Sequence, residues 1–317
     1  MKTLSDQAVG TAHGKIILIG EHAVVYNEPA IAMPFMATPV EVIIEKINGG
    51  SVISSSYYQG LLQTVPDSLK NLKSLIQSIC SDLNQPVDGL SISISSLIPP
   101  ERGMGSSAAV ATALVRALFA YFERDIAHDT LLNYVEISEK IAHGNPSGLD
   151  ARVTSSASPI YYKKNSHFAS IPLHVSGYLI AADTGMKGQT KKAVRDVARQ
   201  MERASHQTLT IIKKIGHLTE EARLAIQDDH VELLGELLTL SHDCLKQINV
   251  SNDRLDHLVD TAIKNHALGA KLTGGGRGGC MIALARTAKQ AKLIAHKLME
   301  NGAVETWIHA LGENSNE

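Results

Sequence analysis

The sequence predicts an α+β protein of two domains, and three observations support this prediction. The chain has 317 residues, which is the length of two ordinary domains. A strand, a Gly-rich loop and a helix follow one another near residue 100, and the second half contains strands and helices of its own. We therefore expect one domain over residues 1–168 and a second over residues 169–317.

The elements of the first half follow from apolar patterns. Residues 16–20 form an apolar run of strand length, and residues 40–45 predict another strand. Leucine and isoleucine recur at helical spacing between residues 69 and 83, which predicts a helix with this face in the core. A further helix is expected from Asp129 to the Gly- and Pro-containing breaker at residues 143–146.

A Gly-rich loop joins the central strand and helix of this half. Apolar and polar residues alternate strictly over residues 90–95, which is the period of a half-buried strand. Residues 108–122 contain no Gly or Pro and are rich in Ala and Leu, as expected of a helix. The sequence PPERGMGSS, residues 99–107, connects the two.

This loop favours a phosphate ligand. The start of a helix has four free backbone N–H groups and the positive end of the helix dipole, and Gly103 and Gly105 would let the backbone approach an anion. Ser106 and Ser107 add hydroxyls there. One alternative is an ordinary helix cap or tight turn. Another is a dinucleotide-binding fold, because Gly103, Gly105 and Ala108 fit Gly-x-Gly-x-x-Ala, although the alternating strand argues against it.

The second half predicts a different order, namely strand, helices, strand, strand, helix, strand. Strands are expected at residues 178–182, 271–273, 280–284 and 305–311, and helices at residues 189–214, 219–247, 252–266 and 287–301. This is the split βαβ order of a ferredoxin-like domain. The Gly cluster at residues 274–279 is too costly in chain entropy for an ordinary hairpin, so we expect its backbone to approach another group closely.

Composition excludes several classes of function. With 30 basic and 32 acidic side chains, and no basic stripe with interleaved aromatic residues, nucleic acid is not an expected partner. The most apolar stretch, residues 29–44, is broken by two prolines and a glutamate, so no membrane span is expected. Three distant cysteines and the absence of a secretory signal predict a cytoplasmic protein without disulfides.

Four side chains could perform phosphoryl transfer, which requires a metal, a base and a cation beside the phosphate cradle. Glu139 is a candidate metal ligand, Asp150 a candidate base and Lys15 a candidate cation, with His22 near the same strand as Lys15. Each also has an ordinary explanation as a solvated, turn or strand-end residue. Spacing alone leaves both explanations open.

Four segments resemble the motifs of the GHMP kinases, a family of small-molecule kinases. Residues 14–26 resemble the first motif, residues 99–109 the second and residues 271–280 the third. Residues 143–150 resemble the segment that carries the catalytic aspartate in the mevalonate-phosphorylating members. The segments occur in family order, and within the family the sequence is similar to the bacterial mevalonate kinases.

The resemblance implies both a fold and an activity. The N-terminal domain would be like ribosomal protein S5 domain 2, and the C-terminal domain would be ferredoxin-like. The activity would be ATP-dependent phosphorylation of the C5 hydroxyl of mevalonate, with Mg²⁺. There are two alternatives. One is a related kinase that acts on phosphomevalonate or homoserine, and the other is a non-catalytic sensor. The oligomeric state stays open, with a homodimer as one option.

The resemblance also implies roles for particular residues. Asp150 matches the base that takes the hydroxyl proton, and Lys15 matches the lysine that pairs with it. Glu21 and His22 match positions on the substrate side. The positions that match ATP contacts are Pro99, Gly103, Met104, Gly105, Ser106, Ser107, Ala108 and Ala109.

Two further positions match magnesium ligands, and a few depart from the family pattern. Ser107 and Glu139 match the metal ligands. Glu101 and Arg102 replace small residues of the second motif, and Arg277 replaces a glycine of the third. These departures concern the conformation of the loops, since every reactive position is kept.

Overall fold

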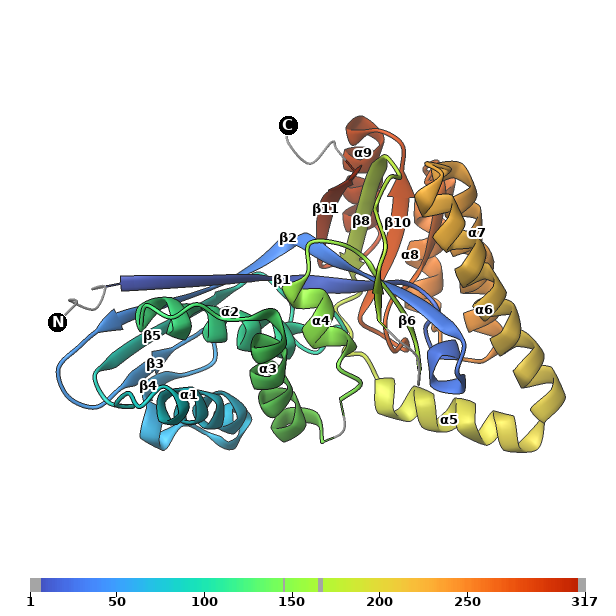
Figure 1. The fold of residues 1–317 in the computed structure, drawn as a ribbon. Helices are drawn as coiled ribbons and strands as arrows, with labels where there is room; N and C mark the ends of the chain where they lie inside the picture. The colour runs from blue at the N-terminus through green and yellow to red at the C-terminus, as the bar shows by residue number, and fades with distance from the viewer. Residues whose placement is uncertain (1–6, 145, 165–167, 313–317) are drawn as a thin grey trace. The chain divides into compact units, whose positions relative to one another are not determined.

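The structure of the protein, a computed structural model, describes residues 7–144, 146–164 and 168–312. The chain divides into two compact units, each assembled from separate segments (Figure 1). Unit 1 consists of residues 1–15, 38–99 and 105–156, and unit 2 of residues 16–37, 100–104 and 157–317. The expected domain boundary between residues 168 and 169 stays a prediction.

Strands of unit 1 belong to a seven-stranded sheet of the described residues, in the order β4-β3-β5-β2-β6-β7 with β1 also paired to β2. Strand β5 (Leu90–Ser96) pairs with the second half of β2 (Pro29–Lys46) antiparallel and with β3 (Val52–Ser54) parallel. Strand β4 (Gln59–Leu61) pairs with β3, and the long β1 (Gln7–Ile19) pairs with β2. The strand predicted at residues 90–95 is confirmed.

The α-helices in the described part of unit 1 form a group centred on α2, the helix that follows the Gly-rich loop. They are α1 (Lys70–Asp82), α2 (Ser106–Tyr121), α3 (His128–His143) and α4 (Leu149–Ser155), with short 3₁₀ turns at Leu62–Thr64 and Asp67–Leu69. Helix α2 contacts the other three. A Cβ on Gly10 of β1 would lie 2.1 Å from the Ala113 carbonyl oxygen, so β1 lies directly on the α2 backbone. The Ala-rich sequence of α2 permits this close packing.

Unit 2 contains a four-stranded antiparallel sheet in the order β11-β8-β10-β9. Its strands are β8 (Gly177–Asp183), β9 (Gly269–Leu272), β10 (Cys280–Ala285) and β11 (Glu305–Leu311). When the four strands of this sheet are numbered 1 to 4 along the chain, their order in the sheet is 4-1-3-2. The ferredoxin-like arrangement predicted from the sequence is confirmed. The first half of β2 pairs with β6 (Ile160–Lys163), which pairs with β7 (Ala169–Ser170).

The helices of unit 2 differ in part from the prediction. They are α5 (Thr190–Arg203), α6 (Ser205–Gln227), α7 (Val231–Gln247), α8 (Asp253–Lys264) and α9 (Ala288–Glu300), with a 3₁₀ turn at Ala23–Tyr26. The single helix expected over residues 189–214 is wrong, because Ala204 leaves the helical region with φ −135° and ψ 53°. The helix expected over residues 219–247 is also wrong, since Asp229 turns the chain with φ 54°.

These helices connect the strands of the sheet (Figure 1). Helix α9 packs on β8 and β11, and α8 packs on β9 and β10. Helices α6 and α7 contact each other as a helical hairpin. The connection between β8 and β9 consists of the four helices α5, α6, α7 and α8. Within the described residues, no helix is both long and apolar enough to cross a bilayer.

Candidate active site

Lys15 and Asp150 form an ion pair in unit 1. Lys15 lies on β1 and Asp150 in the first turn of α4, which begins after Gly148 with φ 77°. Lys15 Nζ lies 3.2 Å from Asp150 Oδ1, and the two side chains are 5% and 40% exposed. The lysine is therefore enclosed while its carboxylate partner stays accessible to another molecule.

The end of the Gly-rich loop lies against this lysine. Gly105 is the N-cap of α2, with φ 73°, and a Cβ there would lie 2.8 Å from Lys15 Cγ and 3.4 Å from Thr154 Cγ2. Both the backbone conformation and the close contact therefore require glycine. Because Gly105 occupies the cap position, the ordinary explanation that Ser106 or Ser107 caps the helix is wrong.

Ser107 and Glu139 each place in unit 1 a buried oxygen atom that has no hydrogen-bond partner among the described residues. Glu139 lies on α3 and is buried. Within the described residues, Glu139 Oε1 and Ser107 Oγ have no hydrogen-bond partner, and His143 Nε2 lies 3.9 Å from Glu139 Oε1. Burial raises the pKa of Glu139, and the Ser107 hydroxyl and His143 oppose this shift. Buried oxygen atoms left unpaired are costly, so this pair is suited to a ligand or a cation.

The donor set at this position also limits which metal fits. No group of three His, Cys, Asp or Glu side chains that could hold a metal ion occurs in the part of the chain that the structure describes. Mg²⁺ is commonly held by one or two protein oxygens together with waters and substrate phosphates. One carboxylate and one hydroxyl therefore suit a metal that arrives with a phosphate ligand.

Glu21 is held by a buried lysine in unit 2, Lys271. Glu21 follows the end of β1 and is 1% exposed, while Lys271 lies on β9 and is fully buried. Lys271 Nζ donates to Glu21 Oε1, and to the Leu272 carbonyl oxygen at 2.6 Å. Burial raises the pKa of Glu21 and lowers that of Lys271, and their attraction opposes both shifts. The second carboxylate oxygen of Glu21 is buried without a hydrogen-bond partner in the described residues.

His22 is buried beside Glu21 and is held by the backbone of the third motif. Its Nε2 lies 3.1 Å from the Gly275 carbonyl oxygen. Burial lowers the pKa of His22 to about 4, so the ring is neutral at pH 7 and Nε2–H donates to this carbonyl. His22 adopts φ 61°, a strained conformation for a residue other than glycine. The first and third motifs therefore meet in unit 2.

Sequence reasoning missed the role of Lys271. A signal was present, because this lysine lies in a strand whose other members are glycine, alanine and leucine. A lysine buried in such a strand requires a carboxylate partner. Nothing in the sequence indicates which of the 32 acidic residues provides it.

The close backbone approach expected at residues 274–279 is confirmed, and the partner is the chain itself. A Cβ on Gly275 would lie 2.0 Å from Thr190 Oγ1, and one on Gly276 would lie 2.0 Å from the Val250 carbonyl oxygen. These glycines are explained by packing within unit 2.

Arg277, which departs from the family pattern, fastens the same loop. It adopts φ 56°. Its Nη1 donates to Asp196 Oδ2 at 2.5 Å, and its Nε and Nη2 donate to the Asn249 carbonyl oxygen at 3.0 and 2.9 Å. The arginine therefore ties the third motif to α5 and to the segment after α7.

The remaining predicted ATP contacts lie along the loop and the first turns of α2. Met104, Ala108 and Ala109 are buried in the core. Pro99 lies between β5 and α2, and Gly103 has φ 81°. Because their side chains pack inside the protein, the three buried residues can offer a ligand only backbone groups.

Comparison with known protein families agrees with this geometry. The model of the GHMP kinases N terminal domain matches residues 70–156, and the model of the GHMP kinases C terminal domain matches residues 222–304. Together these domains cover more than half of the chain. The chain belongs to the GHMP kinase family.

Relatives of the chain at about 32% identity include mevalonate kinases. The chain is 32% identical over 304 residues to the mevalonate kinase of Pyrococcus furiosus, covering 88% of this chain and 89% of that one. The mevalonate kinase of Thermococcus sibiricus is 32% identical over 327 residues, covering 96% of this chain and 97% of that one.

Solved structures give the same result. The crystal structure of mevalonate kinase from methicillin-resistant Staphylococcus aureus MRSA252 has a TM-score of 0.77 at 34% identity, covering 97% of this chain and 100% of that one. The crystal structure of L. major mevalonate kinase in complex with R-mevalonate has a TM-score of 0.85 at 27% identity, covering 98% of this chain and 99% of that one. A dinucleotide-binding oxidoreductase is therefore excluded.

Proposed function

We propose that this chain transfers the γ-phosphoryl group of ATP to the C5 hydroxyl of mevalonate, forming 5-phosphomevalonate and ADP. The observation that carries the proposal is the ion pair of Lys15 and Asp150, against which Gly105 of the Gly-rich loop packs. A base and a cation beside a phosphate-binding loop are what phosphoryl transfer requires. Relatives that match nearly the whole chain are named mevalonate kinases.

Asp150 is the proposed base. The C5 hydroxyl oxygen of mevalonate attacks the γ-phosphorus, the bond to the β–γ bridging oxygen breaks, and the hydroxyl proton moves to Asp150. A positioned base of this kind contributes ~10²–10⁴-fold to a rate. Lys15 pairs with this carboxylate and would stabilise the negative charge on the transferring group. The accessible carboxylate and enclosed lysine support these two roles.

The Gly-rich loop is the proposed phosphate site. Backbone N–H groups and the serine hydroxyls would contact ATP, while the buried side chains among these residues hold the loop in place. The residues assigned to ATP are Pro99, Gly103, Met104, Gly105, Ser106, Ser107, Ala108 and Ala109.

Members of this family use ATP with a divalent metal ion, and we assign Mg²⁺. Ser107 and Glu139 would hold it, which is supported by their buried and unpartnered oxygen atoms. The ion would neutralise charge on the ATP phosphates. For this ion the protein would supply the Glu139 carboxylate and the Ser107 hydroxyl, whose oxygen atoms have no hydrogen-bond partner among the described residues.

Glu21 and His22 are the proposed mevalonate contacts. The free buried oxygen of Glu21 can accept a hydrogen bond from a substrate hydroxyl. His22 is neutral at pH 7, so it adds no charge of its own. The strained conformation of His22 supports a functional position.

Three further predictions from the sequence belong to this proposal. They are a cytoplasmic location, a homodimer, and a domain boundary between residues 168 and 169. The free cysteines Cys80, Cys244 and Cys280 are all buried in the described structure, which is compatible with a reducing compartment.

A coupled assay for ADP release tests the proposed function. The purified chain is supplied with ATP, Mg²⁺ and mevalonate, phosphomevalonate or homoserine in parallel, and the product is identified by mass spectrometry. Of the three acceptor substrates, we expect only mevalonate to be phosphorylated. The Asp150→Asn variant, purified in the same way, controls for contaminating kinases. A higher kcat/KM for either other substrate would replace mevalonate in the proposal, and no ADP release with any of them would leave a non-catalytic protein.

A further inference from the structure

We propose that Arg102 and Asp183 form a positioning pair that holds the Gly-rich loop in its nucleotide-binding conformation and so sets the affinity for ATP. The inference rests on the proposed function in one respect, the binding of ATP phosphates by residues 103–107. Neither residue has been given a role above, and Arg102 stands where the family has a small residue.

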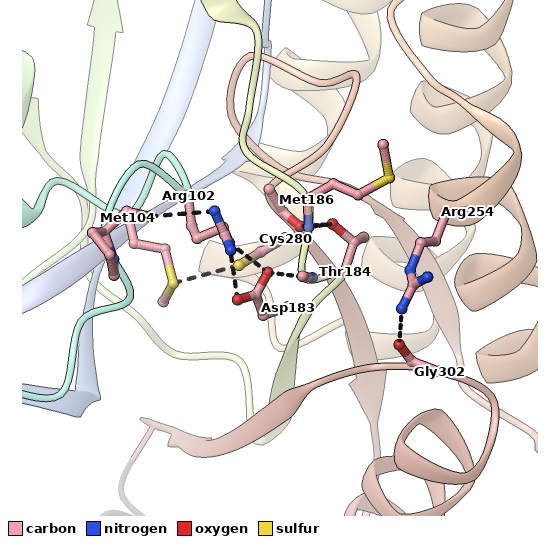
Figure 2. Close-up of polar contacts among 11 residues, drawn as sticks. Arg102, Met104, Asp183, Thr184, Met186, Arg254, Cys280 and Gly302 are labelled. Carbon is pink, nitrogen blue, oxygen red and sulfur yellow. Dashed lines mark hydrogen bonds and ion pairs between the residues drawn. The ribbon is translucent and has the colours of Figure 1, made fainter.

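The pair has the geometry of a strong charge-assisted contact (Figure 2). Arg102 Nε donates to Asp183 Oδ1 at 2.8 Å and to Oδ2 at 2.9 Å. The arginine and aspartate side chains are 14% and 5% exposed. Ion pairs in this environment are screened much less by water and salt than surface pairs are.

Asp183 is a rigid anchor. It is the last residue of β8, the strand that lies between β10 and β11, and it pairs with Cys280 on one side and Glu305 on the other. Its Oδ1 also accepts a hydrogen bond from the Gly185 backbone N–H at 2.8 Å. The carboxylate is therefore fixed before it meets Arg102.

The loop requires such an anchor because its backbone is strained. Glu101 has φ 56° and Gly103 has φ 81°, so two of three successive residues lie in the left-handed region. A residue other than glycine holds this conformation only where its surroundings impose it. The loop segment itself makes no helix or strand over residues 100–104.

Other contacts fix the same segment from the other side. A Cβ on Gly279 would lie 2.9 Å from the Arg102 carbonyl oxygen, so the backbone of the loop lies on the third motif. Met104 Sδ lies 3.7 Å from Cys280 Sγ at the start of β10 (Figure 2). Arg102 is thus held at its backbone and at its guanidinium, both within unit 2.

A second ion pair in the loop provides a matched control. Glu101 pairs with Lys187, but these side chains are 61% and 75% exposed. Exposed pairs contribute little to stability. Removing Lys187 therefore changes the charge next to the loop without removing a buried anchor.

Breaking the buried pair should weaken nucleotide binding selectively. Without the pair the loop samples other conformations, and ATP must order it on binding, which lowers affinity. Chemistry at saturating ATP uses the ordered loop in either case. We expect Arg102→Met to raise the Kd for ADP and the KM for ATP ~10-fold, with kcat and the KM for mevalonate changed less than ~3-fold.

The experiment measures ADP binding by calorimetry and steady-state kinetics for Arg102→Met, Asp183→Asn and the double variant. Because the two residues act through one contact, the double variant should bind ADP no more weakly than the worse single variant. Arg102→Lys, which keeps the charge but loses the Nε–H group shared by the two carboxylate oxygens, should have an ADP affinity between those of Arg102→Met and the parent. Lys187→Met should bind ADP like the parent.

Three outcomes would overturn the inference. The first is a parental Kd for ADP in Arg102→Met or, if that variant does not fold, in Arg102→Lys. The second is an equal loss of kcat and of affinity for both substrates. The third is additive effects in the double variant. Failure of the proposed function is distinguished by Gly105→Val, because unchanged ADP binding there would remove the loop from the nucleotide site altogether.

Discussion

At the scale of single residues, Asp150 and Lys15 are the pair that we propose to carry the chemistry. Their contact at 3.2 Å joins an accessible carboxylate to an enclosed ammonium group. Asn and Met keep the approximate size of these side chains while they remove the charge. Variants at the two positions therefore separate catalysis from folding.

Asp150→Asn should fold and bind ATP and mevalonate but lose ~10²-fold or more in kcat, because the amide cannot accept the hydroxyl proton. Lys15→Met should also lose turnover. The double variant should lose much less than the product of the two effects, since the pair acts as a unit. Steady-state kinetics and calorimetric binding measure these quantities, and a kcat for Asp150→Asn within a few-fold of the parent would contradict the mechanism.

Glu139 is the residue on which the proposed metal site depends. Glu139→Gln keeps the shape of the buried side chain and removes its charge, so the ion loses its carboxylate ligand. We expect a lower kcat and a higher concentration of Mg²⁺ for half-maximal rate, measured by magnesium titration at fixed ATP. Glu136→Gln, on the same helix and paired with exposed Lys140, is the control. Equal magnesium dependence in both variants would assign Glu139 a structural role.

At the scale of elements, the start of α2 links the fold to the site. Gly105 caps the helix in the left-handed region and contacts the Lys15 side chain. The helix therefore begins where the loop contacts the side chain of Lys15, the proposed catalytic lysine. No other residue type satisfies both conditions without a shift of the backbone or of Lys15.

Gly105→Val should lower both nucleotide affinity and turnover. A β-branched residue at φ 73° costs about 1–3 kcal/mol in backbone strain, and its Cβ would displace Lys15 Cγ at 2.8 Å. Calorimetric titration with ADP and kinetics measure the two effects. Gly144→Val is a control, because that glycine has φ 83° but, its chain neighbours aside, no atom of the described residues lies within 4 Å of an added Cβ. Equal effects in the two variants would attribute the loss to strain alone.

At the scale of the whole molecule, buried histidines couple stability to pH. His242 on α7 accepts a hydrogen bond at Nδ1 from the Leu272 backbone N–H at 3.3 Å, and its Nε2 lies 3.2 Å from Asp256 Oδ1. Burial lowers the pKa of His242 to about 4, although Asp256 opposes the shift. His242 therefore takes up a proton near pH 6.5 in the unfolded chain, but only near pH 4 in the folded chain.

The free energy of unfolding should fall as the pH decreases from about 6.5 towards 4, because the unfolded state binds more protons in this window. His242 alone accounts for up to about 3 kcal/mol. Urea unfolding at pH 7.0, 6.0 and 5.0 measures the dependence. His242→Gln removes the titrating group, so its stability should change less over the same range, and an unchanged slope would assign the dependence to other groups.

Much of the fold and part of the site could be predicted from the sequence, and the misses have a common cause. Local patterns predicted the strand over residues 90–95, which the structure has at Leu90–Ser96, and the helix over residues 287–301, which the structure has as α9. The break at Ala204 was missed, because alanine is a good helix former and nothing nearby signals an end. The partner of Lys271 was missed because it lies 250 positions away.

The sequence by itself determined the order of elements, the Gly-rich loop and the residue types available for phosphoryl transfer. Alternation, helical spacing and the placement of Gly and Pro depend on residues a few positions apart, so they can be found along the chain. The family motifs then marked Lys15, Glu139 and Asp150 as candidates.

Only the tertiary structure decided which of these residues meet. It assigned residues 16–37 and 100–104 to unit 2, placed Asp150 beside Lys15, and gave Arg102 a buried partner in Asp183. Buried charges are stable only when they are paired, but pairing is decided by packing in space rather than by separation along the chain. For this reason the sequence shows which charges are present, and the fold shows which of them act together.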